Sequence, residues 1–333
     1  MFGETHMLAQ FMDFTGTFLG LVLEYFRKPF SRFHWPYLLT SLVFALLAWF
    51  IYEAREPAGK RKGLIQFLFP RSVWLHKSAI LDYKYVFVDK LIIGFLGAAA
   101  AVVTGKALAK GNHEAMLGSA AGDSLTVAVF YTICLLLTED MFRYWMHRLM
   151  HKVPLLWEFH KVHHSPEVLV PFSLLRTHPV NGLLNLARTG AAIVLVTGIF
   201  LLIFPEKLSP ITIFGINIGR VLFNVCGAHL RHSHIWLGFG PVLSRIFISP
   251  SMHQIHHSAH THHWDRNFGS QFAIWDWLFG TLYIPKAEER HSMKLGLGGD
   301  DYIEYRSVKD LYFIPFKQAW QRLKQRRAWN WAV

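Results

Sequence analysis

Residues 124–151 read SLTVAVFYTICLLLTEDMFRYWMHRLMH, an apolar run that continues directly into two histidines. Residues 124–138 are apolar enough to enter a bilayer. His147 and His151 are spaced i, i+4, so a helix that continues the run places both imidazoles on one face, within reach of a metal ion. The stretch therefore predicts a helix that begins in lipid and ends in a histidine-lined site.

The composition is typical of a membrane protein. Of the 333 residues, 52% are hydrophobic and 17% are charged, whereas charged residues make up about a quarter of an ordinary globular chain. Four further runs can enter a bilayer: 37–52, 86–103, 183–204 and 211–226. A full span needs roughly 20 residues, so flanking residues are expected to extend all but 183–204.

Positive charges are unevenly distributed between the loops. Lys and Arg number seven in 53–85, five in 139–181 and thirteen after residue 228, against two in 104–123 and one in 205–210. By the positive-inside rule the first three segments face the cytoplasm. This predicts an all-α integral membrane protein with about four transmembrane helices, in which 86–103 and 124–138 form one hairpin and 183–204 and 211–226 another. A cytoplasmic helical cap carries the histidines.

The ends of the chain are expected at the membrane surface. Residues 7–26 are amphipathic and carry two acids, so we expect an interfacial helix there, and the orientation of run 37–52 stays open. Residues 316–331 favour a helix on an anionic membrane face, with a solvated tail as the alternative. The net charge is +12, and the Lys and Arg residues are concentrated in the segments assigned to one side of the membrane. This distribution excludes nucleic acid as a partner. The bacterial inner membrane or the endoplasmic reticulum is the expected location.

Eight of the 20 histidines form three boxes. The second and third boxes, HKVHH at 160–164 and HQIHH at 253–257, follow Pro154 and Pro250, which predicts short helices. Lone histidines are interpreted as caps or surface groups, namely His6, His34, His76, His113 and His291. Eight neutral imidazoles packed together without metal would leave ring nitrogens unsatisfied, which is costly. The boxes therefore predict a metal site.

Ligand type alone leaves zinc, copper, iron and nickel open, because imidazole suits all four. Eight or more histidines exceed one octahedron, so two ions are predicted, and two adjacent redox-capable ions suggest oxygen activation. An alternative is a histidine-rich membrane metal transporter or a metal-storage protein. Transporters usually place their ligands within the spans, near the midplane, whereas these boxes lie at or beyond helix ends.

The boxes together with five flanking motifs resemble the fatty acid hydroxylase superfamily, also called the sterol desaturase family. The flanking motifs are ED at 139–140, LRTHP at 175–179, HSH at 232–234, DRNFG at 265–269 and WDWLFGT at 275–281. The resemblance implies an N-terminal part of residues 1–80, a catalytic domain of 81–285 and a basic tail of 286–333. It also implies a membrane enzyme that uses two iron ions and O2 to hydroxylate or desaturate a lipid such as a sterol, fatty acyl or alkyl chain.

The resemblance also implies roles for individual residues. One metal is assigned His147, His160, His163, His253 and His256, and the other His151, His164 and His257. His232 is expected to join the second metal, and His229, His234 and His178 are further candidates for its shell. Side chains expected to support the ligands are Asp140, Glu139, Asp265, Asp276 and His263. Asp276 has an alternative role at a helix end.

The resemblance further implies an external source of electrons. The sequence has no dinucleotide-binding Gly-x-Gly-x-x-Gly motif, no cysteine cluster and no haem-attachment motif. Electrons are therefore expected to come ultimately from NAD(P)H through a separate protein of the cytochrome b5, ferredoxin or reductase type. The lipid substrate is expected to enter from the bilayer. The lipid, the carbon, the choice of hydroxylation or desaturation and the oligomeric state stay open.

Overall fold

A computed structural model gives the fold. It describes residue 27 and residues 33–53, 56–57, 60–108, 125–204, 228–299 and 302–324, with the backbone alone for 94–108. These residues form helices and loops without a strand. The helices are α2 Trp35–Tyr52, α3 Leu64–Leu68, α4 Arg71–Trp74, α5 Lys77–Leu108, α6 Leu125–Lys152, α7 Pro154–His164, η2 Pro171–Leu175, α8 Pro179–Ile203, η3 Ala228–His232, α11 Gly240–Leu243, α12 Pro250–His256, η4 Thr261–His263, α13 Ile274–Leu278, η5 Ala287–His291 and α14 Val308–Lys324.

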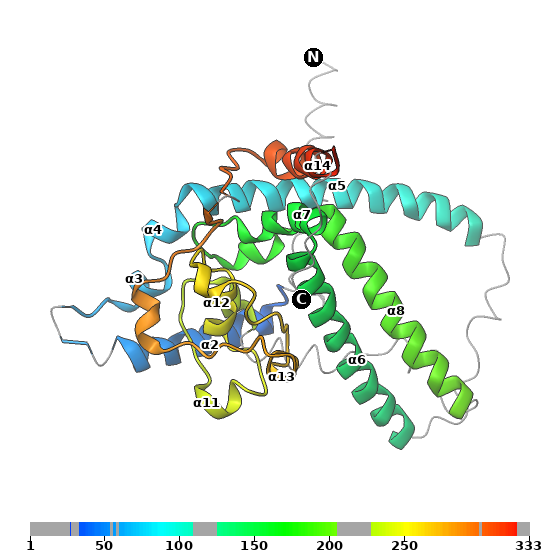
Figure 1. Cartoon of the computed structure of the whole chain (residues 1–333), viewed down its shortest axis with the longest axis horizontal. Coiled ribbons are helices and arrows are strands. Elements are labelled where there is room, and N and C mark those ends of the chain that lie inside the picture. The colour runs from blue at the N-terminus through cyan, green and yellow to red at the C-terminus, as the bar shows by residue number, and fades with distance from the viewer. Residues whose placement is uncertain are drawn as a thin grey trace, which may run out of the picture.

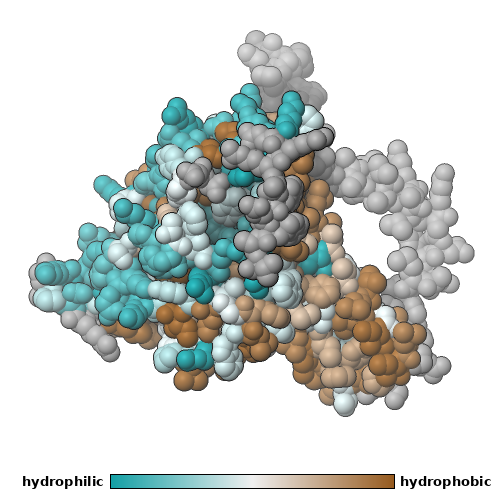
Figure 2. All heavy atoms as spheres, in the orientation of Figure 1, coloured by the Kyte–Doolittle hydropathy of each residue, from teal (hydrophilic) through white to brown (hydrophobic). Residues whose placement is uncertain are grey.

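Among the described residues, three helices are long and apolar enough to cross a membrane, which supports the predicted all-α membrane protein: α2, α6 and α8. Most of the side chains in their apolar windows are at least partly exposed, since 22% of each window is buried inside the molecule. Figure 2 shows the resulting hydrophobic surface over α6 and α8, with hydrophilic side chains gathered on the opposite side of the view. Exposed apolar side chains of this extent are expected to face lipid.

Helices α6 and α8 pack against each other along their length, and α5 runs across their histidine-bearing end (Figure 1). Tyr131 and Val196 are core residues of the α6–α8 contact, and the Tyr131 hydroxyl lies 2.9 Å from Thr197 Oγ1. The predicted layout of two hairpins stays a prediction, because run 211–226 and the side chains of 94–103 lie outside the described residues. The predicted N-terminal interfacial helix at 7–26 lies outside them too.

The short helices of the cap begin where the sequence predicts. Pro154 and Pro250 each occupy the first turn of their helix, where a missing N–H costs nothing. Ser249 caps α12 by accepting a hydrogen bond from the Met252 N–H. His178 caps α8 in the same way, since its Nδ1 accepts from the Val180 N–H. These caps fix the starts of the helices that carry or adjoin the histidine boxes.

The helix expected in the tail begins at Val308, eight residues earlier than predicted. Its buried face, with Leu311 and Ala319, packs against α7 and α5. Phe316, Trp320 and Leu323 are exposed on another face. Contact of this face with a membrane stays a prediction, and residues 325–333 lie outside the described part of the chain.

Replacing Phe200 by Ala is expected to lower the free energy of unfolding by about 3–5 kcal/mol, because it empties a packed site between α6 and α8. Leu202, on the same helix, is 86% exposed, and Leu202→Ala is expected to cost about 0.5 kcal/mol or less. Denaturation in detergent measures both. Equal losses for the two variants would show that α8 does not pack on α6 through this face.

Candidate metal centre

Nine histidines from four elements converge where the end of α6 meets α7, η3 and α12. Group one contains His147, His151, His160, His164 and His256. Group two contains His163, His232, His253 and His257. Within each group the candidate ligand nitrogens all lie within 4.8 Å of one another. The two groups abut, because the rings of His164 and His257 stack with centroids 4.5 Å apart.

Helical spacing explains which histidines share a group. The i, i+4 pair His147 and His151 on α6 meets the i, i+4 pair His160 and His164 on α7. Their Nε2 atoms are close across the helices, with 3.1 Å between His147 and His160 and 3.1 Å between His151 and His164. Group one is completed by His256 of α12, whose Nε2 lies 3.0 Å from that of His147.

Group two is built around η3. His232 Nε2 lies 3.2 Å from His163 Nε2 and 3.1 Å from His253 Nε2. His257 Nε2 lies 3.2 Å from His253 Nε2, again an i, i+4 pair. The structure therefore places the predicted candidate His232 among the side chains that can serve the second ion.

The predicted division of the ligands between the two ions differs from the grouping of the histidines in the structure. It placed His163 and His253 with His147, and His151 and His164 in the other set. An i, i+4 pair differs by about 40° around a helix and an i, i+3 pair by about 60° in the other direction. His160 therefore stays with His164 and His253 with His257, while His163 and His256 each cross to the other group.

Three further candidates belong to neither group. His178 uses both ring nitrogens elsewhere, because it caps α8 and its Nε2 hydrogen-bonds to the Tyr312 carbonyl oxygen. His229 Nδ1 lies 3.5 Å from Ser41 Oγ, and its ring packs beside Phe33. His234 Nε2 hydrogen-bonds to the Phe67 carbonyl oxygen. Group two therefore has four histidines without them.

Three of the nine clustered histidines place their outward ring nitrogen beside a backbone carbonyl oxygen. His147 Nδ1 and His256 Nδ1 each lie 2.8 Å from a carbonyl oxygen, of Phe268 and Arg266 respectively. His163 Nδ1 lies 3.2 Å from the Arg176 carbonyl oxygen. A carbonyl oxygen only accepts hydrogen bonds, so these Nδ1 atoms carry the proton and their Nε2 atoms offer a lone pair.

These tautomers test whether the site suits a metal ion. The Nε2 atoms of His147 and His256 are both acceptors, yet they lie 3.0 Å apart. Two lone pairs at that distance repel unless a cation lies between them. Separations of 3.0–3.2 Å match neighbouring ligands at right angles around an ion with bonds of roughly 2.1–2.3 Å, close to usual metal–imidazole lengths. The residues fit a pair of metal ions.

Burial keeps the box histidines neutral. It is the largest cause that lowers the pKa of His160, His164, His253 and His257 well below the ordinary value, and neighbouring imidazoles lower the pKa of each further. Burial likewise lowers the pKa of His256 to about 4, although its hydrogen bond to Arg266 opposes this. A neutral imidazole is the form that binds a metal.

Two of the acids that were predicted to accept hydrogen bonds from the ligand imidazoles, Asp276 and Asp140, accept them from backbone N–H groups instead. Asp276 accepts hydrogen bonds from the Phe268 N–H at 2.8 Å and the Gly269 N–H at 2.7 Å, so it fixes the loop whose Phe268 carbonyl binds His147. A Cβ at Gly269 would lie 2.7 Å from the Asp276 carboxylate, so this close approach requires glycine. Asp276 also accepts from Thr281 Oγ1 just beyond the end of α13, in line with its alternative predicted role at a helix end.

Three of the remaining predicted supporting residues contact groups other than the ligand imidazoles. Asp140 accepts from the backbone N–H groups of Gln271 and Phe272. Asp265 pairs with Lys152 at 2.7 Å, His263 Nδ1 lies 2.9 Å from Ser258 Oγ, and Glu139 is buried. The sequence offered no signal for the three carbonyl partners of the ligands, because every residue carries a carbonyl. Asn181, 3.1 Å from His160 Nδ1, was missed as well.

A cleft of about 250 Å³ reaches group one from the surface. His151, His164 and His256 form its inner end. Trp157 packs against His151 with ring centroids 5.0 Å apart, and Trp264 lines the same cleft. The arrangement gives small molecules a route to a buried cluster of neutral metal ligands.

Comparison with known proteins identifies the domain that contains this cluster. Residues 132–281 match the family model described as fatty acid hydroxylase. Residues 132–281 are therefore similar to the fatty acid hydroxylase and sterol desaturase superfamily. The matched stretch includes all nine clustered histidines and lies inside the predicted domain of 81–285. No solved structure matches this chain.

The relatives of this chain act on lipids, as their names state. The chain is 28% identical to alkylglycerol monooxygenase of Danio rerio over 55% of its own length and 36% of the relative. It is 30% identical to ornithine lipid hydroxylase of Rhizobium tropici over 47% and 43%, and 29% identical to lathosterol oxidase of Rattus norvegicus over 55% and 52%. The chain thus spans about a third to a half of these relatives.

The metal-free domain is expected to lose stability as the pH falls from about 7 to about 5. The pKa of His256 is about 4 in the folded state and 6.5 ordinarily, so below pH 6.5 the unfolded chain takes up a proton that the folded site excludes. This contribution is complete above pH 6.5 and is lost progressively toward pH 4. Thermal denaturation across this range measures it, and a melting temperature that rises on acidification contradicts it.

Asp276→Ala is expected to lower the free energy of unfolding by about 2–5 kcal/mol, because it leaves two buried N–H groups without an acceptor. Asp310 offers a matched control, since its carboxylate accepts from the N–H groups of Arg306 and Ser307 at an exposed position. Asp310→Ala is expected to cost less than about 1 kcal/mol. Chemical denaturation compares the two, and equal costs would refute the role given to the Asp276 loop.

Proposed function

We propose that this protein is a membrane-bound di-iron oxygenase that hydroxylates or desaturates a C–H bond of a lipid. One observation carries the proposal: two abutting groups of neutral, buried histidines lie at the end of an apolar helix pair. Oxidoreductases that act on lipids are among the relatives. An all-nitrogen donor set suits iron, and two redox-capable ions together suit reduction of O2.

The residues of each group would hold one ion. The five histidines of group one and the four of group two would bind through Nε2. Bound iron would supply the electrons that reduce O2 and the oxidising power that breaks a lipid C–H bond. The carbonyl groups of Phe268, Arg266 and Arg176 keep the ligand protons on Nδ1, so each Nε2 lone pair stays directed toward its ion.

The fold supports a substrate that arrives from the bilayer. Leu183 and Leu186, near the start of α8, are 66% and 70% exposed, so the apolar surface of the helix pair extends to its histidine-bearing end. A lipid chain can follow this surface while its head group stays in water. We further propose that four transmembrane helices form two hairpins and that the histidines lie on the cytoplasmic side, where the basic loops are expected.

Electrons would come from a separate protein, because the sequence contains no motif for a flavin, haem or iron–sulfur group. The basic cap offers a docking surface for an acidic donor. Donors of the cytochrome b5, ferredoxin or reductase type carry electrons from NAD(P)H and fit this requirement.

The test is purification from cells supplied with iron, followed by metal analysis and oxygen consumption with a ferredoxin, its reductase, NADPH and a lipid extract. About two iron ions per chain and a lipid that gains oxygen or loses two hydrogen atoms are expected. Two zinc ions with no oxygen consumption contradict the proposal. Metal flux into liposomes would instead favour a transporter.

His163→Ala and His256→Ala are each expected to lower lipid oxidation on the order of 100-fold or more, since each removes a ligand from a different group. His291→Ala is the control, because His291 is exposed and belongs to neither group. Mass spectrometry of the lipid product measures all three. Equal activity in the three variants would contradict the assignment of the ligands.

A further inference from the structure

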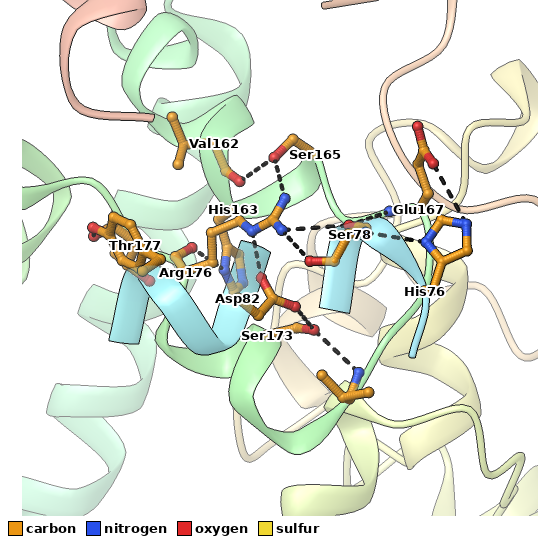
Figure 3. A network of polar contacts seen from close by, with 12 residues as sticks. His76, Ser78, Asp82, Val162, His163, Ser165, Glu167, Ser173, Arg176 and Thr177 are labelled. Atoms are coloured by element: carbon orange, nitrogen blue, oxygen red, sulfur yellow. Dashed lines mark hydrogen bonds and ion pairs between the residues drawn. The ribbon is translucent and has the colours of Figure 1, made fainter. Parts of the chain in front are cut away.

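A buried ion pair lies directly behind group two. The side chains of Asp82 and Arg176 are 0% and 2% exposed, and the Arg176 Nε donates to the Asp82 carboxylate (Figure 3). Asp82 comes from α5, whereas Arg176 directly follows η2. Asp82 also lies outside the 132–281 stretch that matches the family model.

The guanidinium of Arg176 is held on every side. Besides the bond to Asp82, its Nη1 donates to Ser165 Oγ at 3.1 Å, and its Nη2 donates to the Ser78 carbonyl oxygen at 2.7 Å. Ser173 Oγ donates to the other Asp82 oxygen at 2.6 Å. Figure 3 shows these partners surrounding the guanidinium. The side chain of Arg176 therefore has one position.

The backbone of the same residue holds a metal ligand. The Arg176 carbonyl oxygen lies 3.2 Å from His163 Nδ1. The next carbonyl along, of Thr177, accepts a hydrogen bond of 2.6 Å from the Tyr85 hydroxyl. Ser78, Asp82 and Tyr85 follow i, i+4, i+7 spacing and share one face of α5. One face of α5 thus fixes the loop that orients His163.

We propose that Asp82 is a positioning residue that sets the metal affinity of group two through Arg176 and His163. The proposal rests on the proposed function, because it takes the two groups as metal sites. If the Asp82 carboxylate is removed, the buried Arg176 guanidinium has no counter-charge, which is strongly unfavourable. The loop then shifts to hydrate the guanidinium and withdraws the carbonyl from His163.

The effect is specific to one group. In group one, His147 and His256 are oriented by the carbonyls of Phe268 and Arg266, which belong to another loop. His160 lies beside Asn181 of α8. None of these three contacts involves Arg176, so loss of Asp82 weakens group two and spares group one.

The test is titration of metal-stripped full-length protein with Zn²⁺, which binds imidazole and has no redox chemistry. Wild type is expected to bind two ions, and His253→Ala identifies the binding step of group two. Asp82→Asn is expected to weaken that step about 10–100-fold and to leave the other unchanged. Arg176→Lys keeps the buried charge but loses part of the hydrogen-bond fork, so a smaller change in the same step is expected.

Tyr131→Phe is the matched control, since it removes a hydroxyl contact between α6 and α8 far from Arg176. It should leave both binding steps unchanged. Equal weakening of both steps by Asp82→Asn, or no weakening, overturns the positioning role. If Asp82→Asn does not fold, the Arg176→Lys titration decides by the same criterion. Wild type that binds fewer than two ions would instead overturn the proposed function.

Discussion

The repulsion between neutral imidazole lone pairs is the constraint on which the rest of this structure depends. His147 and His256 both carry their proton on Nδ1, because each Nδ1 lies beside a carbonyl oxygen. Their Nε2 lone pairs are then forced to within 3.0 Å of each other. A proton shared between the two Nε2 atoms would also remove the repulsion, but it would give the buried imidazole pair a positive charge, which burial disfavours. A metal ion removes the repulsion, and it needs no compensating proton.

The protein holds this arrangement through backbone rather than through acids. Carbonyl oxygens of three loop residues accept hydrogen bonds from ligand N–H groups. Carboxylates in turn hydrogen-bond to two of the loops that supply these carbonyls. Asp276 holds the Phe268 loop, and Asp82 holds Arg176. A carboxylate placed directly on a ligand would offset part of the metal charge. A neutral carbonyl would leave that charge on a bound ion.

The sequence was sufficient to predict those helices that are specified by neighbouring residues in the chain. An apolar run followed by His147 and His151 predicted α6, and Pro154 and Pro250 predicted the starts of α7 and α12. The nine histidines that converge were all predicted as ligands. Their division between the ions was not predictable from the resemblance, because it depends on the direction in which α7 and α12 present each ring. The i, i+4 rule would have assigned His160 with His164 and His253 with His257 correctly.

Long-range contacts account for the remaining differences. The sequence placed runs 124–138 and 183–204 in different hairpins, and no local pattern predicted the contact between α6 and α8 that joins them (Figure 1). The Asp82 and Arg176 pair joins residues 94 positions apart, and neither side chain forms a recognisable motif with the other. The periodicity of apolar residues cannot predict such pairs, because it indicates only which face of a helix or strand is apolar.

The most direct measurement is an anomalous difference map at the iron absorption edge from crystals of the iron-loaded protein. The account predicts two peaks, one enclosed by the Nε2 atoms of group one and the other by those of group two. A single peak, or two peaks away from these nitrogens, would contradict it.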